Sequence, residues 1–261
     1  MTIRVEVEDG VATVTLDRPD VLNAFNDDLG MATLGAMRDA SADKGVRCIV
    51  ITGAGRAFSS GEDLGALAGS YERGEPPPLG DTLTDRYNPL IRSIRAAPKP
   101  VMAAINGVAA GAGASIALAC DIRIASEHAK LVLAFIKVGL VPDSGALWFL
   151  TKAVGSAEAW RMASSGEPVG AEAALDLGLV DQVVPADEFE STWRAAASRL
   201  AAGPTRAYAL TKSLVQSAAQ VTLDEQLDLE VAAQTEAGLS QDHLEGVKAF
   251  LEKRKPDFQG Q

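Results

Sequence analysis

Two glycine-rich segments could place backbone N–H groups around an anion. They are GAGRAFSSGEDL, residues 53–64, and NGVAAGAGAS, residues 106–115. Each follows an apolar run and leads into a helix-like stretch, where glycines let the backbone turn sharply and leave N–H groups free. Such groups attract negative charge. Two of them aimed at one point would stabilise an oxyanion, whereas either segment alone could be a simple tight turn.

Other common chemistries lack their residues. Gly111–Gly113 follows a predicted strand, but the third glycine of a dinucleotide-binding fingerprint is missing, as is its acidic partner about 20 residues on. His128 and His243 are not near other ligands at metal spacing, so we predict no metal site. Cys48 and Cys120 lie in apolar runs and are expected to be small buried hydrophobes. No serine-hydrolase elbow or phosphate-binding P-loop pattern occurs in the sequence.

One acidic residue stands at a position that has two interpretations. Asp143 follows a proline in the segment GLVPDSG. Its pattern favours a helix N-cap, with a helix over about residues 144–153. A carboxylate in apolar surroundings can instead move protons, because burial raises its pKa towards neutral pH.

The elements that must position these residues alternate between strands and helices. An Asp9-Gly10 dipeptide between two alternating runs predicts a β-hairpin. Buried strands are predicted over residues 46–52, 100–105 and 122–125, and helices over about 26–43, 62–68 and 113–120. This order indicates an α/β fold.

The chain divides into an α/β core over residues 1–185 and a helical C-terminal region over 186–261. Residues 69–84, which include three consecutive prolines, are expected to form a mobile loop or lid. The apolar segment 101–120 is predicted to be a buried strand and helix rather than a membrane span.

A net charge of −11 argues against nucleic acid or an anionic membrane as the main partner. The N-terminal residues MTIRVEVEDG do not resemble a signal peptide. We therefore expect a cytoplasmic protein without membrane association.

Motifs spread along nearly the whole chain resemble the crotonase (enoyl-CoA hydratase/isomerase) superfamily. They are LDRPDVLNAF (16–25), VITGAGRAFSSGEDL (50–64), KPVMAAINGVAAGAG (99–113), ACDIRIAS (119–126), KVGLVPDSGALW (137–148), LVDQVVP (179–185) and EGVKAFLEKRKPDF (245–258). The resemblance implies a ClpP/crotonase-type ββα spiral core with a helical C-terminal trimerisation region. It also implies an acyl-CoA thioester substrate, no separate cofactor, and a homotrimer or a hexamer built as a dimer of trimers.

The resemblance also assigns site residues. The backbone N–H groups of Glu62 and Ala112 would bind the thioester oxygen as it becomes an enolate. Trp148 and the segment near Tyr87 would shape the acyl pocket. The residues expected along the coenzyme A path are Val21, Leu22, Ala24, Ser60, Asp63 and Leu64, together with Lys255 and Phe258, which could reach a neighbouring subunit's ligand. Asp63 could also be catalytic, but a structural role at the start of a helix or along the coenzyme A path is favoured.

The carboxylates then favour one reaction. The two glutamates of family hydratases correspond here to Ser115 and Phe135, neither of which can be a general acid or base. Asp143 occupies the loop in which family isomerases carry a single catalytic acid. The segments RYNPLIRSIRAAPKPV (86–101), AFIKVGLVPDSG (134–145) and QLDLE (226–230) resemble the ring-epoxide isomerase group that acts on phenylacetyl-CoA derivatives. Ala146-Leu147 departs from that group's usual Gly-Thr, which leaves the substrate open.

Two alternatives remain at this point. The chain could be a hydratase or another crotonase-type lyase or hydrolase. It could also be a non-catalytic subunit that binds acyl-CoA, since several positions of the site differ from the family pattern.

Overall fold

The computed structural model describes residues 2–75 and 77–261. A six-stranded sheet lies at the centre of its α/β body. Its strand order is β1-β2-β3-β5-β7-β10, and only the β1–β2 pair is antiparallel. The strands are β1 (Ile3–Glu8), β2 (Val11–Leu16), β3 (Cys48–Gly53), β5 (Val101–Ile105), β7 (Ile122–Ser126) and β10 (Gln182–Val184). The predicted hairpin is confirmed, as are the three predicted buried strands.

A second, smaller sheet includes one short strand from each glycine-rich segment. It has the order β4-β6-β8-β9 and consists of β4 (Ala57–Ser59), β6 (Val108–Ala110), β8 (Lys130–Val132) and β9 (Val169–Gly170). These strands were not predicted, because two or three residues leave no readable alternation. They correct the sequence interpretation, in which each glycine-rich segment led directly from a long strand into a helix.

Helices cover both faces of the large sheet and extend beyond it. They are α1 (Asp27–Ala42), α2 (Leu64–Glu72), α3 (Leu79–Thr82), α4 (Asn88–Ala96), α5 (Ala112–Ala119), α6 (Ala146–Ser165), α7 (Ala171–Asp176), α8 (Phe189–Ala201), α9 (Thr205–Ala218), α10 (Leu223–Gly238) and α11 (Gln241–Glu252). Short 3₁₀ turns occur at η1 (Pro19–Val21) and η3 (Ala134–Val138), and η2 (Leu83–Tyr87) is a wider π-helical turn. The α/β fold and the helices predicted near residues 26–43 and 113–120 are confirmed.

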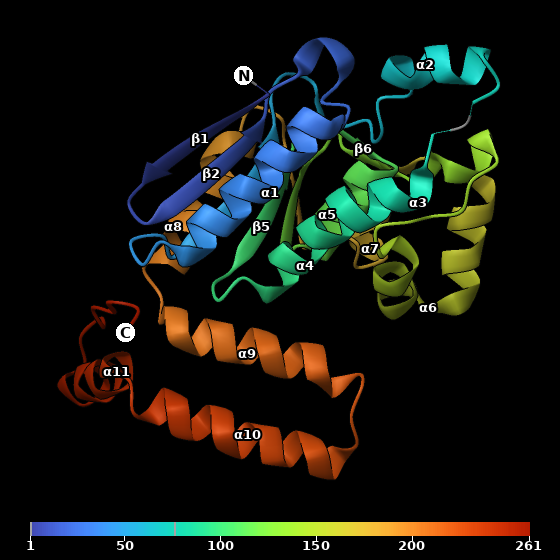
Figure 1. Cartoon of the computed structure of the whole chain (residues 1–261). Coiled ribbons are helices and arrows are strands. Elements are labelled where there is room, and N and C mark those ends of the chain that lie inside the picture. The colour runs from blue at the N-terminus through green and yellow to red at the C-terminus, as the bar shows by residue number, and fades with distance from the viewer. Residues whose placement is uncertain (1, 76) are drawn as a thin grey trace.

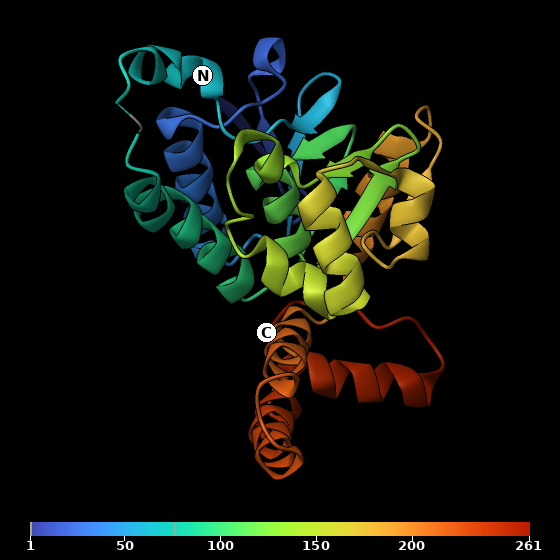
Figure 2. The same ribbon diagram turned by 90° about the vertical axis from the view of Figure 1, so that its right-hand side faces the viewer.

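The C-terminal third is helical, as predicted, but its parts lie in different places. Helix α8 packs on the large sheet, where Phe189 and Trp193 join a buried cluster with Cys48, Val50 and Met102. Helices α9, α10 and α11 form an arm that projects from the α/β body (Figures 1 and 2). The predicted boundary at residue 185 between the α/β core and the C-terminal region stays a prediction. The arm that projects from the α/β body begins only after α8.

Two local predictions need correction. Residues 69–84, predicted to be a mobile loop or lid, are largely helical, because α2, α3 and η2 occupy most of that stretch, and Pro76 lies outside the described residues. Their role as a lid stays a prediction. The helix predicted from residue 144 begins at Ala146 and runs to Ser165, with a kink at Gly155. Gly145 occupies its N-cap position and the side chain of Asp143 does not cap it.

No helix in the described part of the chain is long and apolar enough to cross a bilayer. The apolar segment 101–120 forms β5, β6 and α5, as the predicted buried strand and helix require.

Candidate active site

The two glycine-rich turns lie against each other at one edge of the small sheet. Strands β4 and β6 are parallel neighbours, so the segments that follow them leave from the same edge. Gly61 has a positive φ of 90°, and a Cβ built on it would lie 2.9 Å from the Ala110 carbonyl oxygen and 3.4 Å from the Ala112 nitrogen. Only a glycine permits this close approach, which brings the turn at residue 61 beside the start of α5.

The backbone N–H groups of Glu62 and Ala112 remain available at this junction. Phe25 holds the first turn from both sides, because its N–H donates to the Gly61 carbonyl at 2.7 Å and its carbonyl accepts from the Asp63 N–H at 2.9 Å. Glu62 lies between these bonds, and Ala112 is the first residue of α5. Among the described residues neither N–H has a protein acceptor. Two adjacent N–H donors without acceptors can bind one oxygen anion.

A cavity of about 230 Å³ opens in front of these two residues. Glu62, Tyr87 and Asp143 are its titratable lining groups. Its apolar lining residues are Leu64, Leu79, Leu83, Ala134, Phe135, Val138, Leu140 and Val141. We call this cavity the acyl pocket. Helical turns α3 and η2 form one wall, so the stretch predicted to be a lid does border the pocket.

Asp143 enters the acyl pocket from the turn before α6. The turn contains two left-handed residues, Ser144 with φ 53° and Gly145 with φ 76°, and it closes with a hydrogen bond of 2.9 Å from the Ala146 N–H to the Asp143 carbonyl. The Ser144 hydroxyl donates to the Asp143 carboxylate at 2.8 Å. Burial raises the pKa of Asp143, with a further contribution from the negative charge of Glu62, while the Ser144 hydrogen bond and the cation of Arg86 oppose the rise.

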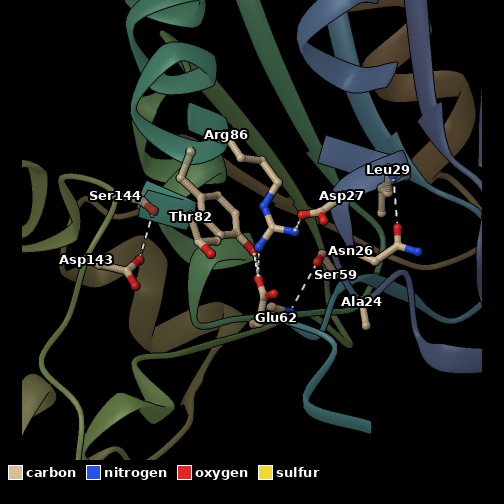
Figure 3. A network of polar contacts seen from close by, with 12 residues as sticks. Ala24, Asn26, Asp27, Leu29, Ser59, Glu62, Thr82, Arg86, Asp143 and Ser144 are labelled. Atoms are coloured by element: carbon tan, nitrogen blue, oxygen red, sulfur yellow. Dashed lines mark hydrogen bonds and ion pairs between the residues drawn. The ribbon is translucent and has the colours of Figure 1, made fainter. Parts of the chain in front are cut away.

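Glu62 brings a second carboxylate to the same pocket. Its Oε2 accepts hydrogen bonds from Arg86 Nη2 and from the Tyr87 hydroxyl, both at 2.5 Å. Arg86 also donates to Asp27 at 2.9 Å, so its guanidinium connects α1 with the first glycine-rich turn (Figure 3). Burial and the neighbouring Glu62 raise the pKa of Tyr87, which keeps the phenol protonated and able to donate.

The sequence interpretation assigned only the backbone N–H of Glu62 to the site and did not single out Arg86. Arg86 gave no local signal, because its neighbours Thr84, Asp85 and Asn88 are polar and do not mark it as buried. Its partner Glu62 could not be identified either, since it lies 24 residues away in a separate turn.

Ser115 and Phe135 fill the positions where the resemblance places hydratase glutamates. Ser115 is fully buried in α5, and its hydroxyl lies within hydrogen-bond distance of the Gly111 carbonyl at 3.3 Å and the Asp143 carbonyl at 3.1 Å. It therefore connects the α5 turn with the Asp143 turn. Phe135 lines the acyl pocket as a hydrocarbon wall.

Of the residues expected along the coenzyme A path, Ser60 and Leu64 line the acyl pocket. The Ser60 N–H donates to the Leu22 carbonyl at 2.9 Å, and its hydroxyl donates to the carbonyl of the exposed Val21 at 3.2 Å.

Two further residues of that set have structural contacts. The carbonyl of Ala24, which is buried, accepts a hydrogen bond from Arg18 at 2.5 Å. Asp63 caps α2 by accepting from the Ala66 N–H at 3.1 Å and forms an ion pair of 2.9 Å with Arg18. The helix-start role considered for Asp63 is therefore confirmed.

Three predicted residues do not reach the acyl pocket of their own chain. Trp148 was expected to shape it, but this side chain lines a separate hollow between α6 and α9 and stacks with Arg95 and Lys152. The cations of Arg95 and Lys152 lie 5.8 and 4.0 Å from the centroid of the Trp148 ring, which favours this position. Lys255 is exposed, and Phe258 packs by α11 in the arm.

No three His, Cys, Asp or Glu side chains within residues 2–75 and 77–261 gather as a metal site would require. The arrangement at the acyl pocket consists instead of two main-chain donors, two carboxylates, and an apolar wall. It can stabilise an oxyanion and move a proton next to it.

Comparisons with known proteins agree with this chemistry. Residues 6–261 match the enoyl-CoA hydratase/isomerase family. The chain is 46% identical to a probable enoyl-CoA hydratase of Rhodobacter capsulatus over 259 residues, which cover 99% of this chain and 98% of the relative. It is 45% identical to the 1,2-epoxyphenylacetyl-CoA isomerase of Escherichia coli, covering 97% of each chain.

Solved structures show the same relationship. An enoyl-CoA hydratase/isomerase from Mycobacterium abscessus superposes with a TM-score of 0.95 at 37% identity, covering 99% of this chain and 100% of the other. An enoyl-CoA hydratase from Polaromonas superposes with a TM-score of 0.92 at 35% identity, covering 98% and 99% of the two chains. The chain therefore belongs to the enoyl-CoA hydratase/isomerase, or crotonase, family.

Proposed function

We propose that this enzyme isomerises acyl-CoA thioesters, with Asp143 as the residue that moves the proton. The observation that supports this most directly is the position of Asp143 in one apolar pocket with the free N–H groups of Glu62 and Ala112. The coenzyme A part enters with the substrate, so we propose no separate cofactor.

A single carboxylate is sufficient for the isomerisation of a 3-enoyl-CoA, because the proton that it removes is the proton that it returns. Asp143 removes a proton from C2, and the electron pair moves into the thioester as a dienolate whose oxygen is bound by the two N–H groups. The protonated Asp143 then returns the same proton to C4, and the double bond ends between C2 and C3. Each N–H donor of this kind contributes about 3–4 kcal/mol to transition-state stabilisation.

More specifically, we propose that the substrate is a ring epoxide derived from phenylacetyl-CoA. The similarity to the E. coli 1,2-epoxyphenylacetyl-CoA isomerase supports it. The apolar wall of the pocket, which includes Leu83, Phe135 and Leu140, also suits a ring.

Asp143→Asn is the direct test, assayed with a 3-enoyl-CoA and with the ring epoxide. We expect kcat to fall by about 10²–10⁴-fold, because the amide cannot accept the proton. KM should change little, since the N–H donors stay in place. A variant with wild-type turnover would refute the proton-transfer role.

Hydration is the second candidate. The carboxylate of Glu62 lines the pocket together with Asp143, so two carboxylates are present although Ser115 and Phe135 are not acidic. The relative named as a probable enoyl-CoA hydratase is also compatible with this reaction. Rapid hydration of crotonyl-CoA would favour this candidate. A protein that binds acyl-CoA but turns over neither substrate would instead be a non-catalytic acyl-CoA-binding subunit.

We further propose a cytoplasmic homotrimer or dimer of trimers, assembled through the arm. Large apolar side chains on α10 and α11 support this, since Leu223 is 72% exposed and Phe250 is 81% exposed in the single chain. Assembly could bring Lys255 and Phe258 to a neighbouring subunit's coenzyme A. Light scattering after size-exclusion chromatography tests this, and a clean monomer would contradict it.

A further inference from the structure

Arg86 is a buried cation beside the acyl pocket, where it contacts the lining residue Glu62. It is 4% exposed and reaches from η2 to two carboxylates, those of Glu62 at 2.5 Å and Asp27 at 2.9 Å. Asp27 is itself exposed, so its charge is largely screened by solvent. The pair with Glu62, whose side chain is 24% exposed, is the interaction that the burial strengthens.

Helix α1 is shaped to receive this arginine. Gly30 faces it, and a Cβ placed on Gly30 would overlap both Cγ and Cδ of Arg86. On the same helix a Cβ on Gly35 would meet no neighbouring atom. The missing side chain at residue 30 therefore leaves the space through which the Arg86 side chain reaches the pocket.

Few charges act on Asp143 from around it. The titratable groups that influence it are Glu62, Arg86 and the protonated Tyr87, and the hydroxyl of Ser144 adds a hydrogen bond. The remaining residues that line the pocket are uncharged. Without Arg86, the pocket would hold two carboxylates and no cation to balance them.

We propose that Arg86 is a positioning residue, which holds the Glu62 carboxylate at the pocket wall and balances its negative charge beside Asp143. The inference rests on the proposed proton-transfer role of Asp143. It adds that the Arg86–Glu62 ion pair, which does not touch the reacting atoms, sets the pH range in which the enzyme is active.

The sign of the effect follows from the charges. A nearby cation favours the ionised carboxylate, and a nearby anion disfavours it. Removing Arg86 should raise the pKa of Asp143, so that its basic form is available only at higher pH. Removing the charge of Glu62 should have the opposite effect, and removing both should nearly cancel.

The experiment measures kcat/KM against pH with 3-hexenoyl-CoA. For Arg86→Gln we expect the acid limb of the profile to shift towards higher pH by about one unit. Arg86→Lys should restore the acid limb to its wild-type pH, and Glu62→Gln should shift it towards lower pH. The double variant with Arg86→Gln and Glu62→Gln should have an acid limb near that of the wild type. Arg194→Gln, which removes a cation from an exposed pair with Glu190, is the charge-matched control and should not move the limb.

A steric variant tests the same inference without changing any charge. Gly30→Ala should displace Arg86 and move the acid limb in the same direction as Arg86→Gln. Gly35→Ala is its matched control on α1 and should leave the limb unchanged. This pair also keeps the test decisive if Arg86→Gln fails to fold.

The outcomes separate the two proposals. If Asp143→Asn is inactive but the limb stays in place in folded Arg86→Gln or Gly30→Ala, the role of Arg86 is refuted and the proposed reaction stands. If Asp143→Asn retains full activity, the proposed reaction itself fails. A shift in the predicted directions, reversed in the double variant, supports the positioning role.

Discussion

Gly61→Ala tests whether the contact between the two glycine-rich turns creates the site. The substitution adds one methyl group at a residue with φ 90°, where it would lie 2.9 Å from the Ala110 carbonyl oxygen. A positive φ costs a non-glycine residue about 1–2 kcal/mol. Overpacking against a fixed backbone atom adds about 1–3 kcal/mol. We therefore expect the free energy of unfolding to fall by about 2–5 kcal/mol.

The same methyl group should impair catalysis, because it pushes the turn away from the Ala112 N–H. Loss of one oxyanion donor lowers kcat by about 10²–10³-fold. We expect a loss of that size with a 3-enoyl-CoA at a temperature where the variant is folded. Urea denaturation followed by circular dichroism measures the stability, and a coupled spectrophotometric assay measures turnover.

Gly178→Ala is the matched control for backbone strain. Gly178 also has a positive φ, 71°, but a Cβ there meets no atom within 4 Å. It should therefore lose only the backbone cost of about 1–2 kcal/mol and keep its activity. Wild-type kcat in folded Gly61→Ala would refute the inference that these two turns form the oxyanion-binding site.

Further predictions concern buried polar groups and thiols. Ser115→Ala removes the hydroxyl that links α5 to the proton-transfer turn, and we expect a roughly fivefold lower kcat with unchanged KM, corresponding to one hydrogen bond of about 1 kcal/mol. Burial raises the pKa of Cys48 and of Cys120 to about 12, so Ellman's reagent at pH 8 should label neither thiol until the protein is denatured; prompt labelling of the native enzyme would contradict this. Lys99 donates to three main-chain carbonyls at 2.8 Å. Lys99→Met should therefore lower the free energy of unfolding by about 1–3 kcal/mol, as measured by urea titration. Lys44→Met, at an exposed position, is the control and should leave the free energy of unfolding unchanged.

Local signals in the sequence were sufficient for much of the fold. The Asp9-Gly10 hairpin forms as predicted because both residues adopt positive φ, 48° and 77°, which that dipeptide permits. The long buried strands were predictable from their continuous apolar runs. Strands β4 and β6 were not, because three residues carry no period and their pairing is decided by contacts across the chain.

The candidate site was predictable where it depends on main-chain geometry. The glycines identified the two turns, and the structure brings both beside Asp143 in one pocket. The ion pair of Arg86 with Glu62 could not be predicted, because it depends on a gap at Gly30, 56 positions before the arginine. The position of Trp148 could not be predicted either, because the hollow that it lines includes Arg95 and Tyr208, which are distant in the sequence.

The π-helical turn η2 has a consequence for comparing relatives. Because it is wider than an α-helical turn, it accommodates one extra residue, and Arg86 and Tyr87 both reach the Oε2 atom of Glu62 although they are adjacent in the chain. Deleting a single residue before Arg86 would leave an ordinary α-helix and rotate the side chains of α3 by about 100° relative to Arg86 and Tyr87. Loss of one codon at this point would therefore change which α3 side chains face the acyl pocket in a single evolutionary step, while both contacts with Glu62 remain, and alignments of relatives should allow a gap there.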